Sequence, residues 1–364
     1  MFAILLAACI FAGGICTPVS ATFTDIKNRD VAVAAAVLES MGIVTGMSPG
    51  IYSPETGLTR AQFCALAVRA TGQENMVNSN NYKMLFTDVR PGSWYTGYVN
   101  LAYSLGLVNG YGNGKFGPED SITYGQAATL MLRMLKYTTD DIGKLWPMDY
   151  TRFADSIGLS EGLSVGPYQE VNRGQAAILV YNTLRTELKN SATLYYQTTA
   201  DLESVKNVII LSNGSQEDGA KRMLSVRSIG AGIATSERYP QKYVLSDTLV
   251  NCVGVLLLDA SGRAIGFIPE TTESAQITVS SAGASSIVSS SGPRHNVGSS
   301  AAVIIGNSIY EYGSGGYTQI DDNAGQTARL YYGDGGIVKY IYMEARKEVQ
   351  TPHDESQAGG GEIS

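Results

Sequence analysis

An internal repeat is the feature that most constrains how this chain can fold. Phe23-Thr-Asp25 recurs as Phe86-Thr-Asp88, and the pair Gly42 and Gly46 recurs as Gly106 and Gly110. The offset is 63 residues at the first motif and 64 at the second. A single unit of about 50 residues with two helices cannot bury its own apolar faces, so we expect the copies to pack around a shared axis.

A third, shorter copy follows the first two. It begins at Gly158 and Gly162, and the distance from its second glycine to the next proline is five residues instead of eight. In every copy a proline stands eight residues before a glutamine, which gives the pairs Pro54 and Gln62, Pro118 and Gln126, and Pro167 and Gln175. The shared spacing predicts three units of one design.

Each unit is expected to contain a helix, a turn bounded by glycines, a loop that ends in proline, and a second helix. In the first copy, Ala34, Leu38 and Met41 follow helical spacing, and the glycine behind them is a natural left-handed cap. The second helix is expected to open on Thr59 or its counterpart Thr123, whose hydroxyl can accept a hydrogen bond from a first-turn amide.

The order Phe-x-Asp-Val, Trp, Gly-x-x-x-Gly, Phe-x-Pro and Thr-Arg-Ala-Gln, repeated from Phe23 to about Leu188, resembles the S-layer homology domain of bacterial surface proteins. The resemblance covers nearly half of the chain and implies an all-α, pseudo-threefold bundle of three repeats, at residues 22–72, 83–137 and 138–190. It also implies grooves between repeats that bind a secondary cell-wall polymer linked to peptidoglycan, commonly one with a pyruvate ketal.

The resemblance further implies polymer-binding residues. Arginines match the family position at the start of the second helix, aspartates match Phe-x-Asp, and tryptophans match the family tryptophan. An arginine fork at a helix start suits a carboxylate, an aspartate can accept hydroxyl hydrogens, and an aromatic face can cover a sugar ring. In chain order these candidates are Asp25, Arg60, Asp88, Trp94, Trp146 and Arg173.

The copies also depart from the family pattern. Tyr124 stands where the second copy should have arginine, glutamine replaces the usual glutamate in all three copies, and Thr138-Thr-Asp140 has lost the aromatic residue. Simpler roles remain open for each candidate: the tryptophans as core, the aspartates as turn caps and the arginines as solvated charges. Because helix-start side chains are rarely core, we expect alanine at Arg60, Tyr124 or Arg173 to leave thermal stability unchanged.

The first 21 residues predict export. They contain no charged side chain, run apolar from Phe2 to Ala12, and end with Val19 and Ala21 at the positions that signal peptidase reads. A membrane anchor would need about 20 unbroken apolar residues, and two glycines interrupt this run. A lipoprotein-type box at Cys9 leaves lipidation open, and the missing basic residues suggest a late start or a fragment.

Beyond residue 190 the sequence predicts strands. Residues 194–345 hold β-branched and aromatic runs separated by turn formers, which indicates a β-rich domain of one or two small modules. The segments 255–268 and 329–342 share the pattern of a hairpin. Serine-rich stretches at 280–286 and 289–292 predict a flexible loop or tether, and 346–364 predicts a disordered tail.

Composition excludes several classes of site. A net charge of −7 argues against nucleic acid or an anionic membrane as the main partner. The two histidines, His295 and His353, cannot build a multi-histidine metal site. After signal cleavage only Cys64 and Cys252 remain, too few for a disulfide framework, and both are expected to be buried packing residues.

Motifs that suggest catalysis are weak. The glycine-rich segment 110–116 lacks the spacing and the Ser or Thr of a phosphate loop. Residues 321–325 resemble half of a calcium loop without its downstream glutamate, so a surface turn is expected. Carboxylates are plentiful, but spacing selects no pair that would serve a glycosidase.

These observations predict an exported, multi-domain, non-catalytic protein of the bacterial cell wall, without cofactor or metal. Its helical repeats would bind the wall polysaccharide and hold the β-rich region outward. A wall-anchored hydrolase and a self-associating S-layer lattice subunit are the alternatives.

Overall fold

The computed structural model describes residues 23–199, 202–214, 223–229, 233–271 and 273–345. The predicted signal peptide 1–21 with Cys9, and the predicted tail 346–364, lie outside the described residues. The chain folds into two compact units. The first runs to Ile229 and also includes Thr235–Thr272, and the second comprises Gly230–Ala234 and the chain from Glu273 onward.

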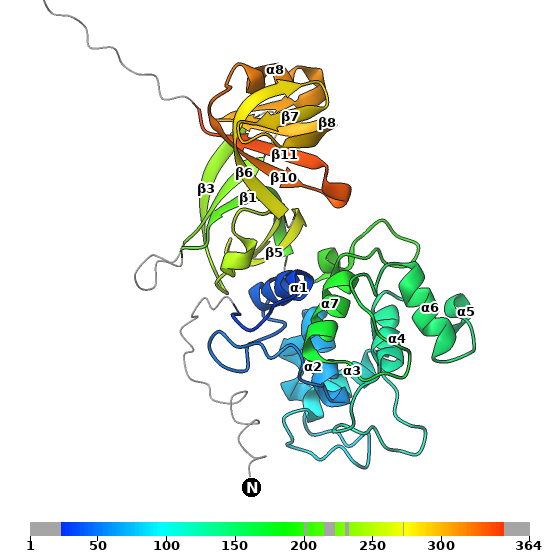
Figure 1. Ribbon diagram of the computed structural model, residues 1–364. Helices are drawn as coiled ribbons and strands as arrows, with labels where there is room; N and C mark the ends of the chain where they lie inside the picture. The colour runs from blue at the N-terminus through cyan, green and yellow to red at the C-terminus, as the bar shows by residue number, and fades with distance from the viewer. Residues whose placement is uncertain (1–22, 200–201, 215–222, 230–232, 272, 346–364) are drawn as a thin grey trace, which may run out of the picture. The chain divides into compact units, whose positions relative to one another are not determined.

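The helices of the first unit follow the three copies (Figure 1). They are α1 (Arg29–Ser40), α2 (Arg60–Ala70), α3 (Thr96–Ser104), α4 (Tyr124–Met134), α5 (Thr139–Ile142), α6 (Met148–Ser156) and α7 (Arg173–Leu184). The first helix of each copy packs on the second helix of another copy, which gives the pairs α3 with α2, α6 with α4, and α1 with α7. The second helices α2, α4 and α7 also pack against one another. The expected packing around a shared axis is therefore confirmed.

A ring of backbone hydrogen bonds joins the three copies just before their second helices. The amide of Ile122 donates to Leu58 O at 3.0 Å, that of Val171 donates to Ile122 O at 3.0 Å, and that of Leu58 donates to Val171 O at 3.1 Å. These residues occupy the same position in each copy, and all three side chains are buried. Val171 of the shortened copy thus takes the same place in this ring as Leu58 and Ile122 of the other two.

The residues that cap the helices are those that the sequence predicts. The N-caps Thr59, Thr123 and Asn172 each accept from the amide three residues on, and the glutamine at that position accepts in return from the cap amide. This reciprocal pair is the capping box, and glutamine serves it as well as glutamate does. After the C-terminal ends of the first helices α1 and α3, Gly42 and Gly106 adopt the positive φ values 69° and 72° that favour glycine.

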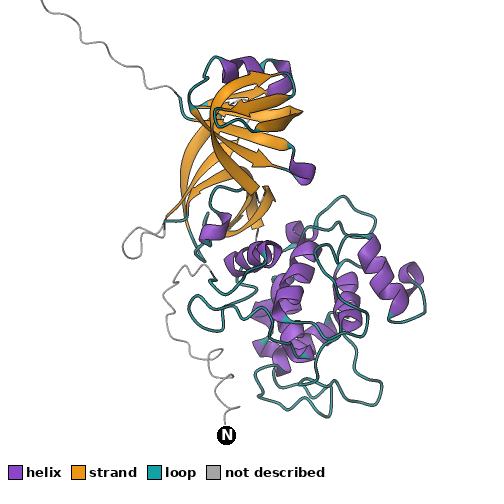
Figure 2. Ribbon diagram, in the orientation of Figure 1, coloured by secondary structure: helices purple, strands orange, loops and turns teal. Residues whose placement is uncertain are grey.

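A five-stranded antiparallel sheet completes the first unit (Figure 2). Its order is β3-β2-β1-β4-β5, with β1 (Leu202–Ser212), β2 (Met223–Ile229), β3 (Ala234–Pro240), β4 (Val253–Asp259) and β5 (Ala264–Thr271). Val255 pairs with Ile268, which confirms the first predicted hairpin. Helix α1 packs against β5, and one buried core runs through helices and sheet. The observed division at residue 272 thus differs from the expected boundary near 190.

The second unit is a small barrel. Its elements are β6 (Glu273–Gly283), β7 (Ser286–Ser289), β8 (Arg294–Ile305), β9 (Ser308–Glu311), α8 (Gly316–Asp321), β10 (Thr327–Tyr332) and β11 (Val338–Met343). The strand order is β11-β10-β6-β7-β8-β9, and a parallel pairing of β8 with β11 closes the barrel. Arg329 pairs with Tyr342, which confirms the second predicted hairpin.

The prediction of a serine-rich tether is wrong. Residues 280–283 belong to β6, and 286–289 form β7. Val279 and Ile287 are buried in the barrel, and the Tyr312 hydroxyl bonds to the carbonyls of Gly283 and Ser286 at 2.6 and 2.9 Å. Two inward apolar residues and this buried phenol order a segment whose serines otherwise suggest flexibility.

Candidate functional site

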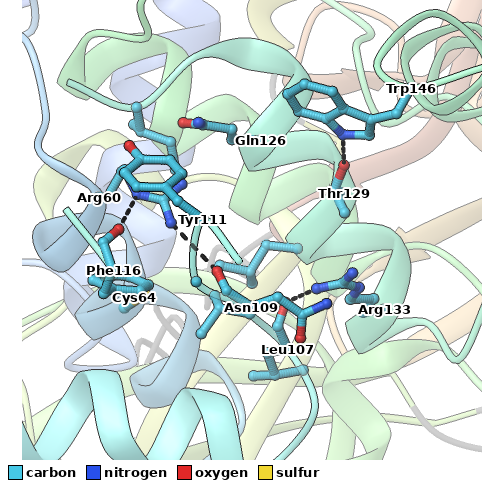
Figure 3. A pocket seen from close by; sticks show the side chains of 14 residues that line it. Arg60, Cys64, Leu107, Asn109, Tyr111, Phe116, Gln126, Thr129, Arg133 and Trp146 are labelled. Atoms are coloured by element: carbon cyan, nitrogen blue, oxygen red, sulfur yellow. Dashed lines mark hydrogen bonds between the residues drawn. The ribbon is translucent and has the colours of Figure 1, made fainter. Parts of the chain in front are cut away.

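A cavity of about 350 Å³ lies where the three copies meet in the first unit (Figure 3). Helix α2, the turn 107–116, helix α4 and the residue just before α6 all contribute to its wall. Its polar and aromatic lining comprises Arg60, Asn109, Tyr111, Phe116, Gln126, Thr129, Arg133 and Trp146. The site therefore draws on all three copies at once.

Arg60 crosses from the first copy into the second. Its Nε donates to Phe116 O at 2.9 Å and its Nη2 donates to Asn109 O at 3.5 Å. The guanidinium carbon lies 4.6 Å from the ring centres of both Tyr111 and Phe116. Only 8% of the residue is exposed, so the alternative of a solvated helix-start charge is wrong for Arg60.

Arg133 brings a second guanidinium to the same cavity from the last turn of α4. Its Nη1 donates to Leu107 O at 3.2 Å, and Figure 3 shows the side chain reaching the glycine-bounded turn. Burial lowers the pKa of Arg133, which still leaves it fully protonated at neutral pH. Among the described residues, no carboxylate forms an ion pair with Arg60 or Arg133.

Trp146 supplies an aromatic wall. Its Nε1 donates to Thr129 Oγ1 at 3.0 Å, and Thr129 in turn donates to Gly125 O at 2.6 Å. The residue remains 51% exposed. The indole is therefore held through its Nε1 while about half of the residue stays exposed.

Arg173 repeats the Arg60 geometry at the junction between the third and first copies. Its Nε donates to Tyr52 O at 2.8 Å, its Nη2 donates to Thr45 O at 3.0 Å, and its guanidinium lies 4.5 Å from the Tyr52 ring centre. Arg69, which stands at the repeat position of Arg133, forms a 2.8 Å ion pair with Glu74 and donates to the Tyr98 hydroxyl at 3.1 Å. No ion pair is formed by Arg173 among the described residues, but Asp25 lies close enough for the charge of Arg173 to help lower its pKa.

The junction between the second and third copies has neither arginine. Tyr124 is 2% exposed, and its hydroxyl donates to Asp155 Oδ1 at 2.7 Å. Burial and the neighbouring carboxylate raise the pKa of Tyr124. The expectation that this helix-start residue is not core is therefore wrong, because the side chain fills the space between two copies.

Asp25 and Asp88 both hold turns. Asp25 accepts from the amides of Tyr52 and Ser53 at 2.9 and 2.6 Å, and Asp88 accepts from those of Phe116 and Gly117 at 2.8 Å each. Burial tends to raise the pKa of Asp25, but these backbone hydrogen bonds outweigh it and lower the pKa. Both oxygens of each carboxylate are thus engaged within the protein.

Trp94 lies apart from the cavity. It is half-buried against the rings of Tyr95 and Tyr98, with ring centres 5.5 and 6.4 Å away. Of the six candidates, the cavity brings together only Arg60 and Trp146. Sequence reasoning missed Arg133, although Arg69 and Arg133 stand 64 residues apart and share the repeat offset.

Other motifs carry no site. Asp321, the last residue of α8, accepts from the amide of Ala282 in β6 at 2.9 Å. In the described parts of the chain, no group of three or more His, Cys, Asp or Glu side chains could hold a metal ion. Cys64 and Cys252 are buried and free, as expected. None of the described helices has both the length and the apolar character needed to cross a membrane.

Comparison with known proteins finds S-layer homology sequence in the first two copies. The model of the S-layer homology domain matches residues 22–64 and 85–128. The chain carries S-layer homology sequence at two positions. Over 189 residues it is 33% identical to a cell surface protein of Thermoanaerobacter kivui, an alignment that covers 51% of this chain and 24% of that protein.

Two further relatives match the same half of the chain. A middle cell wall protein of Brevibacillus brevis is 31% identical over 170 residues, covering 46% of this chain and 16% of that protein. An amylopullulanase of Thermoanaerobacterium thermosulfurigenes is 28% identical over 180 residues, covering 45% and 9%. The chain spans less than a quarter of the length of each of these three relatives. The S-layer homology sequence places the chain at the cell surface, on the cell wall.

Proposed function

We propose that the first unit anchors the protein non-covalently to the cell wall by binding an acidic, peptidoglycan-linked polysaccharide in the cavity around Arg60 and Arg133. The second unit would then be displayed beyond the wall contact. The observation that carries this proposal is the pair of guanidinium groups without ion-pair partners among the described residues, in a cavity that the half-exposed Trp146 also lines.

The chemistry of the cavity suits an acidic sugar. Arg60 uses its Nε and Nη2 on backbone carbonyls, and Arg133 uses its Nη1 on a carbonyl and its Nη2 on the side-chain oxygen of Asn109. A guanidinium has five N–H donors, so each retains donors for a ligand. A carboxylate such as a pyruvate ketal would neutralise charge that the protein leaves uncompensated. Each charge-assisted hydrogen bond is worth about 1.5–3 kcal/mol, and an indole face can cover the apolar side of a sugar ring.

We also propose that residues 138–190 are a third S-layer homology repeat. The closed backbone ring of Leu58, Ile122 and Val171 and the capping box at Asn172 support this assignment. In this scheme the three junctions share a frame but differ in charge. The junction at Tyr124 would bind no anion, because Asp155 already occupies its polar end.

We further propose that this cavity binds without catalysing a reaction. Glycoside hydrolysis commonly needs two carboxyl groups that flank the scissile bond. None of the 14 lining residues is Asp, Glu or His. Release of reducing sugar from the bound wall polysaccharide would contradict this part of the proposal.

Sedimentation with purified cell walls tests the anchoring function. Arg60→Gln and Arg133→Gln should each weaken binding roughly ten- to hundredfold, which is the loss of one charge-assisted bond. Arg152→Gln is the matched control, because its side chain is 81% exposed and lies outside the cavity. Circular dichroism verifies that the variants fold, and Arg60→Lys retains the charge without the planar fork.

The acidic substituent of the polymer provides the decisive comparison. Walls stripped of pyruvate should bind the wild-type protein as weakly as intact walls bind the arginine variants. Equal binding of wild type to both kinds of wall would exclude a charge-based anchor. Formation of two-dimensional sheets by the purified protein would instead favour the lattice-subunit alternative.

A further inference from the structure

The second unit has a strand order that defines a known barrel topology. With β6, β7, β8, β10 and β11 numbered one to five, neighbours around the barrel run 1-2-3-5-4 and return to 1. Strand β6 pairs first with β10 through residues 273–278 and then with β7 through residues 279–283. Strands three and five, β8 and β11, are parallel. This is the topology of the OB-fold.

The helix lies where that fold requires it. Helix α8 comes between strands three and four and packs against β6 and β8. Its Ile320 is fully buried, together with Val303 and Leu330 from the barrel strands. The hairpin strand β9 is an addition that pairs with β8, and its Ser308 also forms a bridge with Ile233. In Figure 1, α8 lies beside β7 and β8.

A cavity of about 350 Å³ lies on this barrel between β8 and the turn that joins β10 to β11. Its lining comprises Gly298, Ser300, Ala301, Ala302, Gly333, Ile337, Val338, Lys339 and Tyr340. In the OB-fold, the third strand and the turn between strands four and five belong to the face that takes oligosaccharides or oligonucleotides. The cavity is therefore in the place where this topology commonly binds a ligand.

The pairing of β8 with β11 is interrupted by a bulge next to this cavity. Val297 pairs with Val338 and Ala302 pairs with Tyr340, so four residues of β8 face a single residue of β11. Their backbone groups have no regular partners on that strand. Gly298 adds no side chain to the cavity wall, the aliphatic part of Lys339 lies against Gly333, and Ile337 is 47% exposed.

The charge of the second unit distinguishes between an oligosaccharide and an oligonucleotide as its ligand. Nucleic acid needs a basic groove that follows the phosphates. Residues 273–345 contain six Asp or Glu against three Lys or Arg, and Lys339 is the one charged residue among the lining residues. Backbone amides and carbonyls, Ser300 and the apolar surfaces of Ile337 and Tyr340 instead match the hydroxyl groups and C–H face of an uncharged sugar.

We propose that the second unit is an oligosaccharide-binding barrel whose site lies between the bulge of β8 at residues 298–301 and the β10–β11 turn. Its ligand is a neutral glycan chain, bound through backbone and serine hydrogen bonds and through stacking on Ile337 and Tyr340. This site is separate from the arginine cavity of the first unit and does not depend on it.

Calorimetric titration of the full chain with neutral tetrasaccharides tests this site. The probes are β-1,4-linked glucose, β-1,4-linked N-acetylglucosamine and α-1,4-linked glucose, each carried to millimolar concentration, with single-stranded oligothymidine as the competing class. We expect saturable binding of at least one tetrasaccharide and none of oligothymidine. The same affinity should persist in Arg60→Gln/Arg133→Gln, which separates this site from the wall anchor.

Two blocking variants locate the site. A Cβ at Gly298 would lie 3.7 Å from Ile337 Cγ2 and from Val338 O, an ordinary contact, so Gly298→Val should fold and fill the cavity. Ser300→Tyr should fill it from the exposed side of the bulge. Each should weaken binding about tenfold or more, equivalent to roughly 1.4 kcal/mol.

Tyr310→Ala is the matched control, because Tyr310 is 37% exposed on β9 and does not line the cavity. Affinity unchanged by both blocking variants would overturn the proposed location. Absence of binding to all three tetrasaccharides, or binding of oligothymidine that Ser300→Tyr abolishes, would overturn the ligand class.

Discussion

Tyr124 should contribute to stability and not to wall binding. It occupies the position that carries arginine in the other two copies, yet it is 2% exposed and donates to Asp155 at 2.7 Å. Tyr124→Phe removes only the hydroxyl. Because Asp155 is exposed and water can replace the lost donor, we expect a loss of about 0.5–1.5 kcal/mol in the free energy of unfolding.

Tyr124→Ala should cost far more, because it also removes a ring that is packed between two copies. Truncation of a buried aromatic side chain typically costs about 3–5 kcal/mol, a large share of the roughly 5–15 kcal/mol that stabilises a domain. Guanidinium denaturation followed by the fluorescence of Trp94 and Trp146 measures this loss. A Tyr124→Ala midpoint equal to that of wild type would refute the reasoning, as would wall binding weakened by Tyr124→Phe.

Four other outcomes are expected. Burial raises the pKa of Glu39 from 4.5 to about 7, so stability should fall as pH rises from about 4.5 to 7, and Glu39→Gln should remove that dependence in thermal melts from pH 4 to 8. Asp88→Asn replaces one of two acceptors with a donor and should lower the free energy of unfolding by about 1–3 kcal/mol in urea titrations. Burial raises the pKa of Cys64 to about 12, so iodoacetamide should label this thiol only in denaturant. Arg60→Gln and Arg133→Gln should be non-additive by about 0.5–3 kcal/mol in wall affinity if both contact one carboxylate.

The frame of the first unit is largely predictable from sequence. Helix starts at Thr59 and Thr123, glycine caps at Gly42 and Gly106, and packing of the copies around an axis all follow from local chemistry that recurs at a fixed offset. These features can be predicted because capping and left-handed turns depend on residues that are close together in the chain. The two β-hairpins are local for the same reason.

What sequence does not predict depends on contacts between distant segments. The serines of β6 and β7 are ordered by Tyr312, which follows them by some 30 residues and bonds to Gly283 and Ser286. The five-stranded sheet shares a core with the helices because β5 packs on α1, more than 220 residues earlier in the chain. The closure of the barrel by β8 and β11 is equally non-local. The spacing of residues within one segment does not show which distant segment it will contact.

The candidate site illustrates why aligning the copies with each other is insufficient. Alignment places Arg60 beside Arg173 and Trp94 beside Trp146, as if each copy carried a complete set. The structure combines Arg60 of the first copy, Arg133 of the second and Trp146, at the start of the third, in one cavity. Each junction is therefore a composite whose chemistry depends on which neighbours meet. Asp25 near Arg173 and Asp155 beside Tyr124 change the charge of the other two junctions without disturbing the shared backbone ring. A repeat can thus retain one fold while its three junctions diverge in charge, because the ring depends on backbone groups and the charge on side chains.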